Sequence, residues 1–519
     1  RIEAETSLYG LDPAGIREIE FRLPLASGEL LDLRFPIAES GTYSLPMDGI
    51  PPGRHDIEVR LVDREGQVAA VRNVPFEKWE DPEWLTRPVA LDALDPEWAP
   101  PPWGPVAVEG KTVHVQGRTF RFRNDAVLPA MTSRGLPLNR DPAALRYRME
   151  DGVHAVDIET TEVTEQHDGL VRVVQSGASP HFAFRAEHAI AFDGLDRIAL
   201  TLTPKVPGVR VEAMDLDMPL DRARYYNSHR YDLGLVGDET FDRIHFLWLG
   251  DEQVGFEWMA ESYKGWRIDT RRPRLAVRRE DGRALLRMRL VNAPAAIGEP
   301  MTLVFGLQPT PVKPLPAGFR DWRFSTSPAW PSVNLWSPHY ARWNTALTKP
   351  TPRSWEVFRD MVAHGRRHGK RVYPYLCPLY ISRYHMIRRD VPFYADPKDL
   401  AAVYDRPISI GKDEERPVVP EAFYFAQEWN SHPPYFQGRT DAGTIHYCSP
   451  AGSYADYFTF WIERMLQEGV DGIYMDLAGP RENFDPARGL SYQTLDGQTE
   501  GAMEIFAARD FYKRLYFLF

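Results

Sequence analysis

Cysteine is scarce in this sequence, which has only Cys377 and Cys448 among 519 residues. Two cysteines cannot build a disulfide framework, although a single bridge between them stays open. An ordinary hydrophobic core must therefore hold the fold. The composition of 43% apolar and 26% charged residues is typical of a globular chain.

Long apolar runs and basic tracts are missing as well. No run of apolar residues is long enough for a membrane span. The 73 Asp and Glu residues outnumber the 62 Lys and Arg residues, which gives a net charge of -11. Because no basic arm offsets this charge, the sequence argues against nucleic acid as a partner.

Several catalytic motifs are absent. The sequence has no HExxH zinc motif, no G-x-S-x-G nucleophile elbow and no dinucleotide-binding fingerprint after a strand. His364 and His368 have the spacing of two metal ligands on a helix. They lie in a basic helix end, however, where positive charge is favoured without any metal. The sequence therefore predicts neither a metal nor a cofactor.

The two ends of the sequence have unusual features. The chain begins with Arg1 and stops at Phe519 inside a helical pattern without a cap, which predicts a fragment truncated at both ends. A secreted or periplasmic location is favoured if a signal peptide was lost. The oligomeric state has no signal in the sequence.

Aromatic residues, by contrast, are plentiful. The sequence has 14 Trp and 23 Tyr. Such residues suit flat surfaces on which sugar rings stack, and large β-sandwiches also use many of them. Both explanations stay open, and a carbohydrate is the partner that the composition favours.

The hydrophobic pattern predicts a multidomain protein: two all-β sandwiches followed by a truncated α/β barrel of the TIM type. Short alternating strands separated by turn residues predict an immunoglobulin-like sandwich over residues 1–88. Further alternating strands predict a larger sandwich over residues 89–316. Strands that alternate with amphipathic helices predict part of a (β/α) barrel, and the catalytic domain, over residues 317–519.

One stretch of the third region shows the repeating unit of such a barrel. Residues 454–468 have a helical pattern closed by Gly469, and the apolar strand that follows ends at Asp476. Catalytic groups of barrels lie at the carboxyl ends of strands. Asp476 is therefore predicted in an active site, whereas Asp471, at the other end of the strand, is predicted to be structural.

Three motifs carry a resemblance to a known family. They are WLGDEQVGFEWMAESYKGW (residues 248–266), the connector TPVKPLP (310–316) and VNLWSPH (333–339). With two sandwiches before a barrel, the chain resembles a bacterial family of predicted glycoside hydrolases related to family 123 glycoside hydrolases. The resemblance implies hydrolysis by an adjacent Asp-Glu pair at a barrel strand end. It also implies that the acetamido group of an N-acetylhexosamine acts as the nucleophile.

The sequence departs from that family at the Asp-Glu pair, because Asp476 is followed by Leu477. Asp-Glu pairs occur at 238–239, 251–252 and 413–414, but none of them ends a predicted barrel strand. Either the pair lies beyond Phe519 or this relative uses another geometry. The Trp-rich segment 248–266 has two interpretations: a finger that completes the pocket, or a plug at a domain interface.

The candidate site residues follow from these placements. The predicted catalytic carboxylates are Asp476, Glu482 in the following loop, and Glu428 in a long insertion. The predicted substrate-binding residues are Asn334, Trp336, His339, Tyr340, Trp343, Tyr375, Tyr380, Arg383, Arg481 and Asn483. Each also has a structural explanation: a loop carboxylate accepts backbone N–H bonds, and a Trp at a strand end packs under the barrel rim.

Together these features predict a glycoside hydrolase that cleaves terminal glycosidic bonds of a complex glycan or polysaccharide. Catalysis would use carboxylates, or the substrate's own amide on an N-acetylhexosamine. A non-catalytic carbohydrate-binding protein is the main alternative. A polysaccharide lyase is a third, for which His339, Tyr340 and Arg383 would supply the chemistry.

Overall fold

The computed structural model describes most of the chain. The described residues are 2–7, 15–25, 27–37, 40–45, 50–78, 80–228, 233–280, 283–321, 332–335, 358–359, 362–363, 365–367, 369, 371–382, 421, 425–433, 436–440 and 443–519. They are mostly β-sheet, and they fall into two compact units, Arg1–Arg87 and Pro88–Phe519. We call these the small unit and the large unit. The predicted further division near residue 316 stays a prediction.

The small unit is a β-structure with a core of its own. Its elements are β1 (Ile2–Ser7), β2 (Ile16–Pro24), β3 (Leu30–Pro36), β4 (Ser40–Leu45), β5 (Gly53–Asp63), β6 (Val68–Lys78) and the short helix α1 (Glu83–Thr86). Strands β3, β2, β5 and β6 form one antiparallel sheet, and β1 pairs with β4. Phe21 from β2, Tyr43 from β4 and Ile57 from β5 share one hydrophobic core, so the two sheets pack as a small sandwich.

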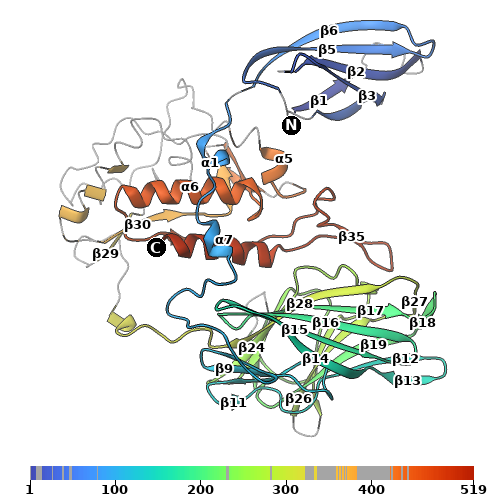
Figure 1. Cartoon of the computed structure of the whole chain (residues 1–519), viewed down its shortest axis with the longest axis vertical. Coiled ribbons are helices and arrows are strands. Elements are labelled where there is room, and N and C mark those ends of the chain that lie inside the picture. The colour runs from blue at the N-terminus through green and yellow to red at the C-terminus, as the bar shows by residue number, and fades with distance from the viewer. Residues whose placement is uncertain are drawn as a thin grey trace. The chain divides into compact units, whose positions relative to one another are not determined.

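The large unit begins with a much larger sandwich, drawn mainly in green and yellow in Figure 1. One sheet has nine strands, in the order β14 (Asp157–Gln166), β15 (Leu170–Ala178), β16 (Phe182–Ala191), β17 (Asp196–Pro204), β28 (Met301–Thr310), β24 (Gly255–Met259), β23 (Phe246–Gly250), β20 (Tyr225–Ser228) and β21 (Leu233–Leu235). A second has six, in the order β13 (Gly152–Ala155), β12 (Ala144–Met149), β19 (Ala213–Leu220), β26 (Arg283–Val291), β25 (Leu275–Glu280) and β22 (Glu239–Phe241).

Smaller elements complete this sandwich. A five-stranded sheet has the order β11 (Leu136–Pro137), β10 (Ala130–Ser133), β9 (Arg118–Arg121), β8 (Thr112–Val115) and β7 (Ala107–Glu109), and β18 (Val209–Val211) pairs with β27 (Ala295–Ile297). The 3-10 helices η2 (Leu91–Leu94) and η3 (Phe319–Asp321) flank the sandwich in the sequence.

Period-2 alternation explains why these segments form sheets. In β16, Phe182, Phe184 and Ala186 are buried while the residues between them are exposed. Residues at alternate positions of a strand point to one face, so each strand supplies one row to the core between the sheets. The predicted β-sandwich part of the fold is therefore confirmed.

The C-terminal part of the large unit mixes short strands and helices. Its elements are β29 (Ser332–Leu335), β30 (Arg371–Leu376), β31 (Tyr380–Ser382), α5 (Ala426–Trp429), β32 (Phe436–Thr440), β33 (Gly443–Tyr447), α6 (Ser453–Gln467), β34 (Tyr474–Met475), β35 (Tyr492–Gln493), β36 (Thr499–Glu500) and α7 (Ile505–Leu518). Figure 1 shows the two long helices of this part, α6 and α7, in orange to red.

Strands β29, β30 and β34 form a parallel sheet in that order. Helical residues 358–359, 362–363 and 365–367 lie between β29 and β30 in the sequence, and α6 precedes β34. Parallel strands joined through helices agree with the predicted βα units. A closed barrel is not evident among the described residues, so the truncated barrel stays a prediction.

Candidate functional site

Asp476 lies where β34 ends, beside the end of β30. Its backbone N–H donates to the carbonyl of Leu376 at 2.8 Å, and Tyr375 and Leu376 pair in parallel with Tyr474 and Met475. The side chain is half-buried. The carboxyl ends of two parallel strands therefore meet at Asp476, the edge of a sheet at which α/β proteins place their ligands.

The residue after Asp476 has an unusual backbone. Leu477 has φ 53, in the left-handed region that disfavours leucine, and its N–H donates to Asp476 Oδ1 at 2.8 Å. A non-glycine residue in this conformation costs on the order of 1 to 2 kcal/mol. Such strain clusters at functional sites, and here it turns the chain immediately after the carboxylate.

The other carboxylate of this strand has a structural role, as predicted. Asp471 Oδ2 accepts the N–H of Val372 at 2.8 Å, and its own N–H donates to the Val372 carbonyl at 2.9 Å. Asp471 therefore joins the N-terminal ends of β34 and β30. Asp471 lies before β34 and Asp476 directly after it, which makes Asp471 a natural control for Asp476.

Arg481 and Tyr380 are brought together by the fold. Arg481 Nε donates to the Tyr380 hydroxyl at 3.4 Å, and its backbone N–H donates to the Tyr447 hydroxyl at 2.9 Å. Tyr380 and Tyr447 are fully buried with ring centroids 5.6 Å apart, and burial raises the pKa of Tyr447 well above its usual value. The tyrosines thus support Arg481, which itself is exposed.

Glu482 faces the large sandwich. Its Oε1 lies 2.6 Å from Arg243 Nη2 and 3.1 Å from His245 Nε2, while His245 Nδ1 lies 2.8 Å from the Ala260 carbonyl. Both ring nitrogens of His245 face acceptor oxygens, so both bonds form together only when both nitrogens carry protons. Burial raises the pKa of Glu482, but the His245 hydrogen bond and the Arg243 charge outweigh it and lower that pKa overall. Glu482 is therefore held ionised.

This ion pair continues into a buried network. Glu500 accepts hydrogen bonds from Arg274 and from the Tyr492 hydroxyl, and Arg243 Nε lies 3.7 Å from it. The backbone N–H of Tyr263 donates to the Tyr492 hydroxyl at 3.0 Å. Charged groups of the sandwich are thus paired with carboxylates of the segment after β34. This network holds the loop that carries Glu482.

Asn483 connects the same loop to two other segments through hydrogen bonds of its side chain. It is fully buried, its Oδ1 accepts the N–H of His432 at 3.0 Å, and its Nδ2 donates to Glu504 Oε2 at 3.1 Å. Its backbone N–H donates to the Ala502 carbonyl at 2.8 Å, and its carbonyl accepts the Ala502 N–H at 3.0 Å. These contacts occupy the amide of Asn483 within the protein.

Glu428 caps a helix. Its Oε1 accepts the N–H and the hydroxyl of Ser453, at 2.8 and 2.6 Å, at the first residue of α6. A carboxylate at a helix N-terminus is stabilised by the unpaired N–H groups there. The structure therefore gives this predicted acid a structural contact, and its catalytic role stays a prediction.

Half of the predicted substrate-binding residues lie outside the described part of the chain. Trp336, His339, Tyr340, Trp343 and Arg383 lie outside the described residues. The backbones of Asn334 and Tyr375 lie in β29 and β30, two adjacent strands of the sheet that contains Asp476. Their expected roles as substrate-binding residues stay predictions.

The Trp-rich segment 248–266 packs inside the large unit. Trp258 and Trp266 belong to the main hydrophobic core. Glu261 Oε1 accepts the N–H of Phe506 at 2.6 Å, and its carbonyl accepts the N–H of Met503. The segment thus holds the start of α7 within the large unit, and its two predicted roles at a pocket or at a domain interface stay predictions.

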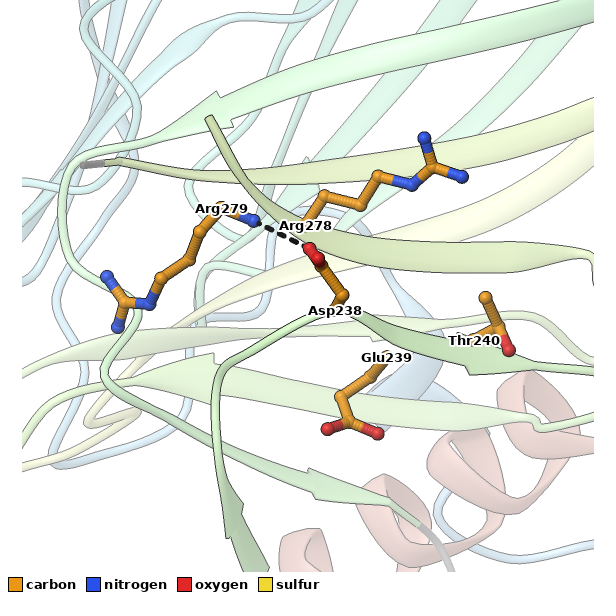
Figure 2. Close-up of a pocket in the computed structure, with 5 residues that line it drawn as sticks. All are labelled: Asp238, Glu239, Thr240, Arg278 and Arg279. Carbon is orange, nitrogen blue, oxygen red and sulfur yellow. Dashed lines mark hydrogen bonds between the residues drawn. The ribbon is translucent and has the colours of Figure 1, made fainter. Parts of the chain in front are cut away.

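A cavity of about 370 Å³ lies elsewhere on the sandwich, lined by Asp238, Glu239, Thr240, Arg278 and Arg279. Figure 2 shows these side chains, with the backbone N–H of Arg279 bonded to Asp238 Oδ1 at 3.3 Å. The lining comes from β22, β25 and the residue before β22. None of the predicted site residues lines it.

Sequence reasoning missed Arg243, His245 and Glu500. Arg243 and His245 precede β23, and Glu500 lies at the end of β36. No motif marks them, because Arg, His and Glu are common residues in and around strands. The one sequence signal near them is the Trp-rich segment that follows His245, because it concentrates aromatic and acidic residues in this part of the chain.

The described residues around Asp476 include no group of three metal-ligating side chains. No helix in the described part of the chain is both long enough and apolar enough to cross a membrane.

Comparison with known proteins gives only remote likenesses. No protein-family model matches this sequence, and no curated protein sequence matches it. Among solved structures, the galactosidase domain of an alpha-galactosidase-sucrose kinase matches 90% of this chain and 68% of its own, at 10% identity and a TM-score of 0.31. Alpha-N-acetylgalactosaminidase NagBb from Bifidobacterium bifidum matches 78% of this chain and 73% of its own, at 11% identity and a TM-score of 0.26.

The heparan sulfate lyase HepC from Pedobacter heparinus matches 38% of this chain and 33% of its own, at 8% identity and a TM-score of 0.26. The matches thus include glycosidases and a lyase. Likenesses of this size do not establish a shared fold or a shared activity, and the relation to family 123 stays a prediction.

Proposed function

We propose that this chain is a glycoside hydrolase that cleaves a terminal glycosidic bond of a complex glycan, with Asp476 at its centre. One observation carries the proposal: a half-buried carboxylate ends a strand of a parallel sheet, and a strained leucine follows it directly. A carboxylate in this position can act as a base, act as a nucleophile or hold sugar hydroxyls.

The contacts of the other predicted carboxylates suggest which role each residue has in the hydrolysis. Glu482 is held ionised by Arg243 and His245, so it suits stabilisation of positive charge better than donation of a proton. An N-acetylhexosamine substrate would supply its own acetamido oxygen as the nucleophile. Asp476 would then orient and polarise that group, and Glu428, the third predicted carboxylate, would protonate the leaving oxygen.

The test is a panel of chromogenic aryl glycosides that includes N-acetylgalactosaminide, N-acetylglucosaminide and galactoside. We expect the protein to release the aryl group from at least one of them, and Asp476→Asn to lower that rate by roughly 10²- to 10⁴-fold. Asp471→Asn, in the segment before β34, keeps an acceptor oxygen for Val372 and should change the rate less than about threefold. Activity of Asp476→Asn within a few-fold of the parent would contradict the assignment.

A second candidate function is carbohydrate binding without catalysis. It is favoured by the contacts of the two other predicted carboxylates, because Glu482 is paired with the sandwich and Glu428 caps α6. Oligosaccharide binding measured by calorimetry, together with no turnover of any aryl glycoside, would support this alternative and contradict the hydrolase. The lyase alternative depends on His339, Tyr340 and Arg383, which lie outside the described residues.

A further inference from the structure

Three potential metal ligands meet at one end of the large sandwich, in a region with no part in the proposed active site. Asp151 lies in the turn between β12 and β13, His154 lies in β13, and His181 lies in the turn between β15 and β16. One ligand atom from each residue falls within 4.8 Å of those of the other two. Asp151 Oδ1 and His154 Nε2 are 2.9 Å apart, and the two imidazole centroids are 4.8 Å apart.

The cluster connects the two main sheets. Strands β12 and β13 belong to the six-stranded sheet, whereas β15 and β16 belong to the nine-stranded sheet. A single ion bound by Asp151, His154 and His181 would therefore join the two sheets at the ends of these strands. Asp151 is exposed and His154 is partly exposed, so an ion can reach the cluster from solvent.

A buried hydrogen-bond chain orients His181. The Tyr147 hydroxyl lies 2.9 Å from His181 Nδ1 and donates to Ser179 Oγ at 2.9 Å, and Ser179 Oγ in turn donates to the Phe182 carbonyl. Because the Tyr147 proton is used toward Ser179, its oxygen accepts from His181 Nδ1–H. His181 Nε2 is then the nitrogen that keeps its lone pair.

This arrangement is the one that metal-binding histidines use. A ligating imidazole donates its other N–H to a neighbouring oxygen, which fixes both its tautomer and its orientation. Tyr147 is 1% exposed and stacks on His154, with ring centroids 5.3 Å apart. One buried tyrosine thus contacts both candidate histidine ligands.

We propose that Asp151, His154 and His181 bind one divalent transition-metal ion, with zinc as the best chemical match. Two imidazole nitrogens and one carboxylate oxygen leave a fourth tetrahedral position for water, and each bond is about 2.0 to 2.2 Å long. The ion acts as a structural link between the two sheets of the large sandwich. Tyr147 is a positioning residue that sets the tautomer of His181.

The test uses the full chain after treatment with EDTA and dialysis. At a free zinc concentration roughly a hundred times the dissociation constant, the melting temperature of the large unit should rise by about 3 °C. Isothermal titration should give one zinc per chain. Cobalt(II) bound at the same site should give the visible absorption of a tetrahedral centre.

Matched variants separate this site from weak surface binding. His154→Gln and His181→Gln should abolish the zinc-dependent rise, and His114→Gln should keep it, because His114 has one carboxylate nearby, Glu109 at 3.7 Å. Tyr147→Phe keeps the buried ring and all three ligands, and should weaken zinc binding by roughly 10- to 100-fold. Asp151→Asn, at an exposed turn, should weaken zinc binding and still fold.

Two results would overturn the proposal. One is a melting temperature of the large unit that zinc does not change. The other is a zinc-dependent rise that survives unchanged in both histidine variants. Neither result depends on glycosidase activity, so the proposed function and the metal site succeed or fail separately.

Discussion

Arg274 and Glu500 form an ion pair in which both side chains are almost fully buried. Arg274 Nη1 and Nη2 contact the two carboxylate oxygens of Glu500 at 2.8 and 2.5 Å, and the guanidinium lies 4.4 Å from the centroid of the Tyr263 ring. Burial raises the pKa of Glu500, but the Arg274 hydrogen bonds and charge outweigh it and lower that pKa. Removing one partner would therefore leave a buried charge with too little compensation.

Arg274→Met should lower the free energy of unfolding of the large unit by about 3 to 5 kcal/mol, because Glu500 stays buried without its main counter-charge. The measurement is guanidinium unfolding followed by tryptophan fluorescence. The double variant Arg274→Met with Glu500→Gln should recover part of the loss, since it removes both charges.

Arg271→Met is the matched control for this prediction. Arg271 pairs with Asp269 at 2.6 Å, but its side chain is 77% exposed, so its loss should cost about 1 kcal/mol or less. If Arg274→Met cost no more than Arg271→Met, the buried pair would not have the stabilising role assigned to it.

Helix α7 shows how one element is held against a sheet. Ile505 and Phe506 form a small core with Leu195 and Met259. Met259 follows Trp258 in β24, and Trp258 belongs to the main core, so α7 packs on the opposite face of that sheet. Ion pairing of Arg509 with Asp193 at 2.9 Å adds a polar contact one helical turn further on.

Phe506→Ala should lower the free energy of unfolding of the large unit by about 3 kcal/mol, because it leaves a cavity between α7 and the sheet. Hydrogen exchange should show faster exchange throughout α7. Phe519→Ala removes an exposed ring of the same kind and should change stability by less than about 0.5 kcal/mol. Equal effects of the two substitutions would contradict the packing described here.

The whole chain contains two units with separate hydrophobic cores. The core of the small unit includes Phe21 and Ile57, and the main core of the large unit includes Leu200 and Leu286. A unit with its own core can unfold as its own cooperative transition.

Differential scanning calorimetry should therefore show two transitions. Phe21→Ala should lower only the transition of the small unit, and Leu286→Ala only that of the large unit, each by several degrees. A single transition that both substitutions shift together would show that the chain unfolds as one cooperative body.

Local patterns predicted much of the secondary structure. Alternation predicted the sandwich strands, and the helical pattern closed by Gly469 predicted α6. The same pattern predicted an apolar strand that ends at Asp476. The structure places Asp476 directly after β34, but β34 has only Tyr474 and Met475, and both are exposed. The predictions of the sandwich strands and of α6 worked because a strand or a helix imposes its period on neighbouring residues.

The contacts of the candidate site could not be predicted from local sequence patterns. Glu482 was predicted as a catalytic carboxylate from its place in the loop after Asp476. That place gives no sign of its observed partner His245, which lies 237 positions earlier in the chain. The proposed metal ligands Asp151, His154 and His181 likewise come from segments that belong to two different sheets. Sequence periodicity determines which residues form a strand and which face is apolar. Which charged side chains then meet depends on how sheets and helices pack, because packing brings together residues that share no local pattern.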